Sequence, residues 1–151
     1  IDREIAMGAQ KWTTVNRYSS TKEALNSLKE KGYKIVATTP HHTAHKLDDF
    51  VLDQPTVLFF GSEKDGLTDT VIEAADEYIY IPTFGFTQSL NISVCAAILL
   101  QELTQRLRKS NLDWQLNASD CLDIKELWLK RNLKDYDKLV TRYELENKGY
   151  S

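Results

Sequence analysis

The sequence lacks the features that would place the chain in a membrane, in an oxidising compartment or among the common nucleotide-binding folds. No apolar run in its 151 residues is long enough to span a membrane, and no signal-peptide pattern is present. The two cysteines do not form a CxxC pair, so we expect reduced thiols in a cytoplasmic protein rather than a disulfide. Neither GxGxxG nor GxxxxGKS/T occurs, which argues against dinucleotide-binding and P-loop proteins.

A large excess of charge of either sign is also missing. The chain has 19 lysines and arginines against 22 aspartates and glutamates, so its net charge of −3 gives no support for nucleic-acid binding. Basic and acidic residues are interleaved after residue 106, which is compatible with solvated helix faces or with a binding surface. The chain begins with Ile1 rather than methionine, which suggests a fragment, a processed form or a missing start.

Three short apolar runs predict buried strands. They lie at residues 34–38, 57–60 and 78–81, and a weaker alternation at residues 13–18 indicates a possible fourth. Residues 40–49 are expected to form a polar loop. Because helical patterns alternate with the strands, we expect an α/β fold with a mostly parallel sheet and helices on both faces.

Two helices have clear signals. The first begins at a capping box formed by Ser20 and Glu23 and ends near Gly32. The second follows the third strand, reaches about Arg108 and carries no charge until Glu102. Because it is apolar nearly all round, we expect it to lie between the sheet and a second subunit, as in a homodimer.

Two polar, glycine-containing loops follow the second and third strands. In residues 61–67, Gly61 and Gly66 allow unusual backbone conformations, and Glu63 either contacts a ligand or merely flanks the next helix. In residues 82–91, polar side chains gather at the start of the long helix, where free backbone amides suit an anion or a ring nitrogen.

One residue of the second loop would suffice to cap the helix, either Ser89 or Asn91, yet Gln88 is polar as well. The two loops together therefore predict a small-molecule site at the carboxyl ends of parallel strands.

A histidine cluster offers a weaker alternative site. His41, His42 and His45 lie beside Asp48 and Asp49, so a metal site is conceivable. The segment lacks a rigid helical frame, however, and we expect a solvated loop without a metal.

The two loops resemble motifs of a known family. Residues 58–67 resemble the second motif of the SpoU (TrmH) family of RNA ribose 2′-O-methyltransferases, and residues 81–94 resemble its third. Residues 7–9 resemble the small-residue segment that precedes its central strands. The resemblance covers roughly residues 5–108, and the variant at residues 88–91 is most like the branch that methylates a guanosine ribose in the D-loop of tRNA.

The resemblance implies a SPOUT fold, in which the C-terminal segment threads a loop to form a trefoil knot. Residues 1–109 would form the SpoU methyltransferase domain and residues 110–151 an appended helical tail. The family is dimeric through the third-motif helix, and its cofactor is S-adenosyl-L-methionine. The expected partner is tRNA or rRNA, and neither DNA nor a membrane is expected.

The resemblance also implies roles for single residues. The adenosine of the cofactor would be bound mainly through the backbone of Thr38, Gly61, Ile81 and Leu90. The family's polar catalytic positions are matched by Glu63, Ser89 and Asn91. The last two would orient the ribose or the base, and the glutamate would order the pocket. The reaction would be an in-line methyl transfer to a ribose 2′-hydroxyl, which needs a nearby base for its proton.

The family's first motif, an asparagine followed by an arginine, has no counterpart before residues 7–9. That arginine is thought to activate the ribose hydroxyl, so we expect this chain alone to be inactive and the full-length protein to be an enzyme. Three alternatives remain: an rRNA substrate, a non-catalytic cofactor- or RNA-binding module, and an unrelated α/β domain whose loops only cap helices.

Overall fold

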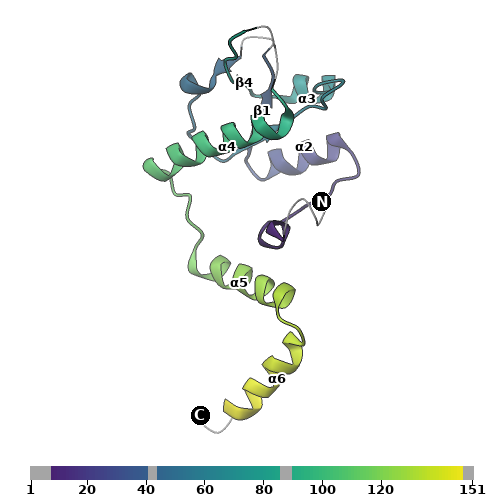
Figure 1. Cartoon of the computed structure of the whole chain (residues 1–151), viewed down its shortest axis with the longest axis vertical. Helices are drawn as coiled ribbons and strands as arrows, with labels where there is room; N and C mark the ends of the chain where they lie inside the picture. Colours follow the sequence, from purple (N-terminus) through teal and green to yellow (C-terminus); the bar gives the residue numbers. More distant parts are fainter. Residues whose placement is uncertain (1–7, 41–43, 86–89, 148–151) are drawn as a thin grey trace. The chain divides into compact units, whose positions relative to one another are not determined.

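The computed structural model describes residues 8–40, 44–85 and 90–147. The chain forms two compact units (Figure 1). One unit comprises Arg17–Trp114, and the other combines the two ends of the chain, Ile1–Asn16 and Gln115–Ser151.

The first unit contains a four-stranded, fully parallel sheet in the order β2-β4-β1-β3. Its strands are β1 (Lys34–Thr38), β2 (His45–Lys46), β3 (Thr56–Phe59) and β4 (Glu77–Tyr80). The predicted parallel α/β sheet is therefore confirmed. Our expectation of a polar loop at residues 40–49 was wrong in part, because β2 pairs with β4 there and a 3₁₀ turn, η2 (Leu47–Asp49), follows it.

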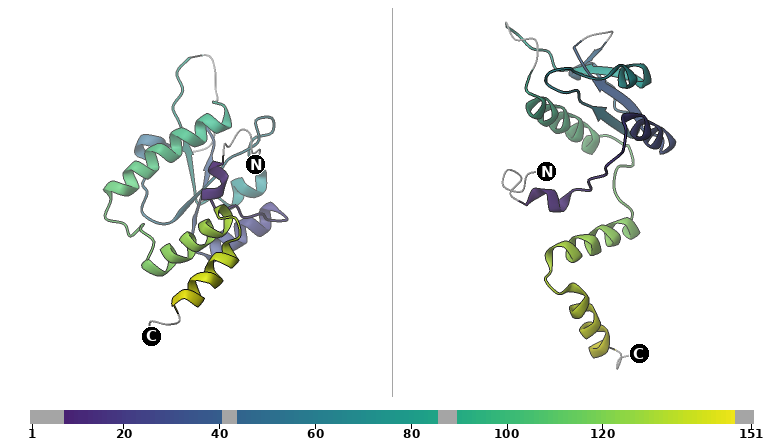
Figure 2. Two further views of the ribbon diagram at one scale, coloured as in Figure 1. Left: turned by 60° about the horizontal axis from the view of Figure 1, so that its bottom comes forward. Right: turned by 90° about the vertical axis from the view of Figure 1, so that its right-hand side faces the viewer.

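Helices cover both faces of this sheet. The helices α2 (Thr21–Glu30) and α3 (Asp69–Ala74) lie on one face, and α4 (Ile92–Lys109) crosses the other (Figure 2). Because side chains alternate along a strand, neighbouring residues of β1 serve both layers, and Ile35, Val36 and Ala37 are all fully buried. The core toward α4 is formed by Val36, Leu47, Phe50, Ile79, Leu99 and Leu103.

A buried lysine lies at the amino-terminal end of the sheet. Lys34 is 7% exposed, and its Nζ lies 2.7 Å from Asp53 Oδ1, 2.8 Å from Glu77 Oε1 and 5.8 Å from the centre of the Phe50 ring. Burial by itself would lower the pKa of Lys34, but the hydrogen bonds to both carboxylates outweigh it and raise that pKa. The charged lysine thus joins β1 to β4 and to the segment before β3, at the end of the sheet opposite the polar loops.

The second unit combines a 3₁₀ turn with two helices. These are η1 (Ala9–Trp12), α5 (Ala118–Asn132) and α6 (Tyr136–Asn147). The Trp12 and Trp128 rings meet edge to face with centres 5.2 Å apart. Arg131 donates hydrogen bonds to the Lys11 and Thr13 carbonyl oxygens at 3.2 and 3.3 Å.

Two expectations concern this part of the chain. The prediction of a possible strand at residues 13–18 was wrong, because that segment has no strand pairing in the structure. The division into a domain of residues 1–109 and an extension of residues 110–151 stays a prediction.

None of the described helices is both long and apolar enough to cross a membrane.

Candidate functional site

The polar loops meet at the carboxyl edge of the sheet. Because β1 pairs in parallel with both β3 and β4, with Ala37 opposite Phe59 and Thr38 opposite Ile79, the segments that follow these strands emerge side by side. A pocket of about 940 Å³ lies here, lined by residues from all three segments and from the start of α4. Its size falls within the range of small-molecule sites.

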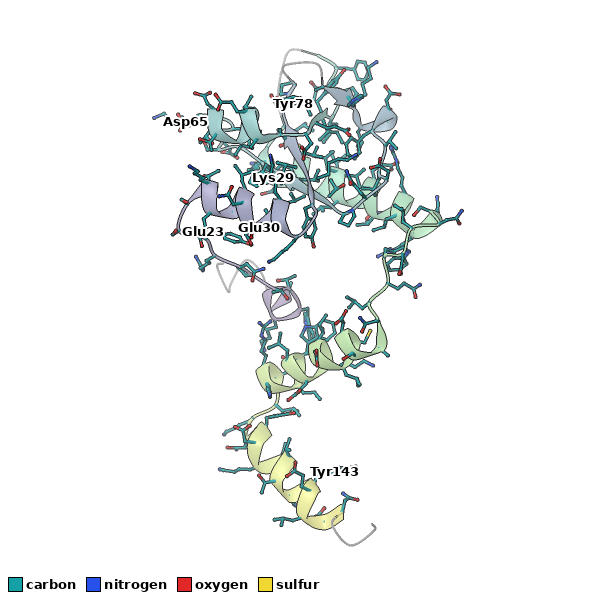
Figure 3. The ribbon with its side chains drawn as sticks, turned by 180° about the vertical axis from the view of Figure 1, so that it is seen from behind. Glu23, Lys29, Glu30, Asp65, Tyr78 and Tyr143 are labelled. Carbon is teal, nitrogen blue, oxygen red and sulfur yellow. The ribbon has the colours of Figure 1, made fainter. Side chains whose placement is uncertain are left out.

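The first loop is a tight turn that closes on itself. The backbone groups of Ser62 and Gly66 exchange two hydrogen bonds, of 2.9 and 3.0 Å, and Gly66 has a φ of 70°. The Asp65 N–H donates to Ser62 Oγ at 2.9 Å, and Asp65 points outward from the unit (Figure 3). A Cβ at Gly61 would overlap the backbone of Gly66 and Leu67, so only glycine fits at this position.

The second loop ends at Asn91, which joins it to the first. Asn91 is the N-cap of α4, because its Oδ1 accepts a hydrogen bond from the Ser93 N–H at 2.8 Å. Its Nδ2 donates to Glu63 Oε1 at 2.8 Å. The two residues are 28 positions apart in the sequence, so this contact exists only because the two strand ends are neighbours.

Six of the seven predicted site residues line the pocket, namely Thr38, Gly61, Glu63, Ile81, Leu90 and Asn91. Ser89 lies outside the described residues. The Thr38 hydroxyl donates to the Phe59 carbonyl oxygen at 2.8 Å, which ties the end of β1 to β3. The roles assigned to all seven stay predictions.

The pocket also has walls that sequence reasoning missed. Pro40, Phe60, Ile72 and Tyr80 contribute to it, and so does Cys95 of α4. Burial raises the pKa of the Cys95 thiol, which therefore stays neutral near pH 7 and acts as part of an apolar wall. Helical spacing could have identified it, because Cys95 lies one turn after Asn91 on the same helix.

Only part of the histidine cluster lies among the described residues. His45 forms part of β2, whereas His41 and His42 lie outside the described residues. Across residues 8–40, 44–85 and 90–147, the structure contains no group of three or more His, Cys, Asp or Glu side chains that could hold a metal ion.

Comparison with known proteins adds independent information. Residues 3–101 match the SpoU rRNA Methylase family. The chain is 37% identical over 136 residues to the tRNA (guanosine(18)-2′-O)-methyltransferase of Borreliella burgdorferi, an alignment that covers 90% of this chain and 62% of that relative. The chain thus spans less than two thirds of the relative's length.

Solved structures of SpoU methyltransferases are also similar to this chain. The A. aeolicus TrmH/SpoU tRNA modifying enzyme is similar with a TM-score of 0.73 and 29% identity, over 89% of this chain and 70% of that one. The SpoU methyltransferase of Streptomyces viridochromogenes, solved in complex with the cofactor AdoMet, is similar with a TM-score of 0.53 and 30% identity, over 60% of this chain and 36% of that one. Because the family match covers well over half of the sequence and both motif loops, the chain belongs to the SpoU rRNA Methylase family.

Proposed function

We propose that the protein transfers a methyl group from S-adenosylmethionine to a ribose 2′-hydroxyl of RNA, with a tRNA guanosine as the substrate. The observation that carries this proposal is the convergence of the two motif loops on one pocket, where Glu63 and Asn91 meet. The Borreliella burgdorferi relative bears the name of that activity, and the match includes both loops.

The pocket suits the cofactor in two respects. Its volume of about 940 Å³ accommodates a nucleoside-sized ligand. Recognition would use the peptide groups of Thr38, Gly61, Ile81 and Leu90, and all four residues line the pocket. The cofactor would lie between the two loops, and the Streptomyces viridochromogenes relative was solved with AdoMet bound.

The chemistry asks little of the protein beyond positioning. S-adenosylmethionine supplies an activated methyl group when bound. Ser89 and Asn91 would orient the ribose, and Glu63 would keep Asn91 in place. The hydroxyl proton needs an acceptor, and that group would come from outside these two loops.

The path of the chain supports the proposed trefoil knot. β1, β2 and β3, with their connections, form a loop that the pairing of β1 with β3 closes. The chain enters from α3 on one face, occupies the gap between β1 and β2 as β4, and leaves to α4 on the opposite face (Figure 2). The passage of this segment from one face of the sheet to the other supports a threaded path, which is rare in proteins.

The outer side of α4 supports the proposed homodimer. Leu99 and Leu103 are buried toward the sheet, whereas Val94 is 47% and Ile98 is 38% exposed. These two residues lie one turn apart and form an apolar stripe that a second copy of the chain would cover.

Cofactor binding and methyl transfer test the function in turn. Calorimetry should detect S-adenosylmethionine binding to the purified protein. Methyl transfer by a form of the protein that includes the arginine motif should then occur to a tRNA transcript but not to one with a 2′-deoxyguanosine at the modified position. Transfer to an rRNA fragment in place of tRNA would redirect the substrate, and an absence of cofactor binding would rule out the proposed function.

A further inference from the structure

The strand β4 and the residue after it have a repeating sequence. Residues 78–81 read Tyr-Ile-Tyr-Ile, which we call the Tyr-Ile repeat. Since side chains alternate between the two faces of a sheet, a shift of β4 by two residues would put tyrosine in place of tyrosine and isoleucine in place of isoleucine. Helices cover both faces (Figure 2), so no polar face selects one register. The repeat by itself therefore leaves the register of β4 undetermined.

The acidic residues just before the repeat do distinguish the two registers. Glu77 Oε1 lies 2.8 Å from Lys34 Nζ, and Asp76 Oδ2 accepts a hydrogen bond from the Ile35 N–H at 2.7 Å. A two-residue shift of β4 toward the amino-terminal end of the sheet would put Ile79 in the place of Glu77. Both acidic contacts with β1 would then be lost, although the apolar packing of the repeat would be reproduced.

A shift in the opposite direction is disfavoured by burial. It would place the Glu77 carboxylate at the position of Ile79, which is fully buried. A carboxylate without a partner in an apolar core is strongly destabilising. The shift toward the amino-terminal end is therefore the competing register. The connection from β4 to α4, residues 81–91, is long enough to give up two residues to it.

Lys34 is placed so that the loss of Glu77 is costly. Its side chain is 7% exposed, and its Nζ lies 2.7 Å from Asp53 Oδ1 as well as near Glu77. Asp53 belongs to the segment before β3, so it stays beside Lys34 in either register of β4. A buried charge that loses one of its partners is destabilised far more than an exposed one, because water cannot replace the partner. The contact with Glu77 is thus the one that depends on the register.

We propose that Lys34 sets the register of β4 by pairing with Glu77, and that it is thereby a positioning residue for the pocket at the opposite end of the strand. Ile79, Tyr80 and Ile81 line that pocket. In the shifted register, Ile81 would be withdrawn from the pocket edge and the second loop would be two residues shorter. The register itself does not depend on the proposed function, but the consequence for the cofactor rests on it.

Lys34→Met tests the proposal, because it removes the charge and keeps a side chain of similar length. Backbone NOEs between β1 and β4 report the register: Val36 lies opposite Glu77 in the structure and would lie opposite Ile79 after the shift. The ratio of the two registers should change by about tenfold or more, the size expected from the loss of a charged hydrogen bond. Saturation-transfer NMR on the ligand-free variant should then detect the second register at about 1% of the molecules or more.

Two further variants separate this role from a general contribution to stability. Glu77→Ala removes the register-dependent partner and should behave like Lys34→Met. Asp53→Asn is the matched control, since it removes the other carboxylate from Lys34 without touching β4. It should keep a single register. If Lys34 only stabilised the sheet, all three variants would behave alike.

A rescue variant uses the hydrogen bond of the first tyrosine. The Tyr78 hydroxyl donates to the Ile72 carbonyl oxygen at 2.9 Å, and in the shifted register Tyr80 would take over this bond. Tyr80→Phe cannot do so. Added to Lys34→Met, it should lower the population of the second register about fivefold, the size expected from one neutral hydrogen bond. A merely structural role of Lys34 predicts no such recovery.

S-adenosylmethionine tests the consequence for the pocket. If the cofactor binds to the observed register, its addition to Lys34→Met should deplete the second register. A cofactor that binds and leaves the two populations unchanged would overturn the positioning role. A wild-type protein that does not bind it would overturn the proposed function, while the measurement on the ligand-free variant would still decide on the register.

A single register in Lys34→Met, down to about 1% of the molecules, would overturn the proposal as a whole. It would mean that packing and Pro82 suffice, because a proline in the place of Tyr80 would offer β2 no N–H. If Lys34→Met does not fold, Glu77→Ala must show the second register, and a single register there would overturn the proposal in the same way.

Discussion

Gly61 is a position in the candidate site that leaves no room for a side chain. The space that a Cβ would need is filled by backbone atoms of Gly66 and Leu67, which cannot move aside as a flexible side chain would. Gly66, in the same turn, has open space around its Cα but a φ of 70°. The two glycines therefore serve one turn for different reasons, close packing in one case and backbone conformation in the other.

Alanine substitutions should separate these reasons. Gly66→Ala should destabilise the protein by about 1–2 kcal/mol, the usual cost of a left-handed non-glycine residue, while the turn persists. Gly61→Ala should destabilise it by more and should abolish S-adenosylmethionine binding, because the turn must open. Thermal unfolding and calorimetry on both variants check this. Equal effects of the two substitutions would contradict the steric argument.

At the scale of elements, α4 links the site to the proposed subunit contact. Its first residues line the pocket, its buried side packs Leu99 and Leu103 against the sheet, and its outer side exposes Val94 and Ile98. The sequence predicted that this helix is buried on every side. In the single chain it is buried on one side, and the other needs a partner to exclude water.

A charge on the outer side of α4 should therefore dissociate the dimer. Ile98→Glu should convert a dimeric protein to a monomer, because a carboxylate buried at an interface without a counter-charge is strongly disfavoured. Val51→Glu is the control, since Val51 is 65% exposed and lies outside α4. Sedimentation at micromolar concentration measures both. A wild-type protein that sediments as a monomer would remove the dimer from the proposal.

At the scale of the whole molecule, the candidate site belongs to one compact unit. All pocket-lining residues, from Thr38 to Cys95, fall within Arg17–Trp114. The second unit has its own internal contacts, including the packing of Trp12 on Trp128. Its helices α5 and α6 contain no buried residue among those described.

Removal of the C-terminal segment tests this independence. A chain that ends at Trp114 should bind S-adenosylmethionine within about twofold of the intact chain, because no lining residue is lost. It should also leave Trp12 without its aromatic partner, which a shift in tryptophan fluorescence would report. Loss of cofactor binding would mean that the pocket depends on residues beyond Trp114.

Local patterns in the sequence were enough to predict the first helix of the sheet-containing unit, its main strands and the elements around the site. The serine at position 20 accepts from the Glu23 N–H at 3.2 Å, as the capping box predicted. The three main strands and the long helix also follow from short-range apolar periodicity. The two site loops were recognisable because glycine and polar residues follow each strand within a few positions.

Tertiary structure alone decided which of these elements become neighbours. β2 has only two residues and is defined by its pairing with β4, not by its own apolar pattern. The place of β4 between β1 and β2 and the contact of Glu63 with Asn91 join segments far apart in the sequence. Such pairings depend on the path of the whole chain, whereas local periodicity and capping depend only on residues within a turn or two. The sequence by itself therefore determined the individual helices, strands and loops, and the fold determined which of them meet at the site.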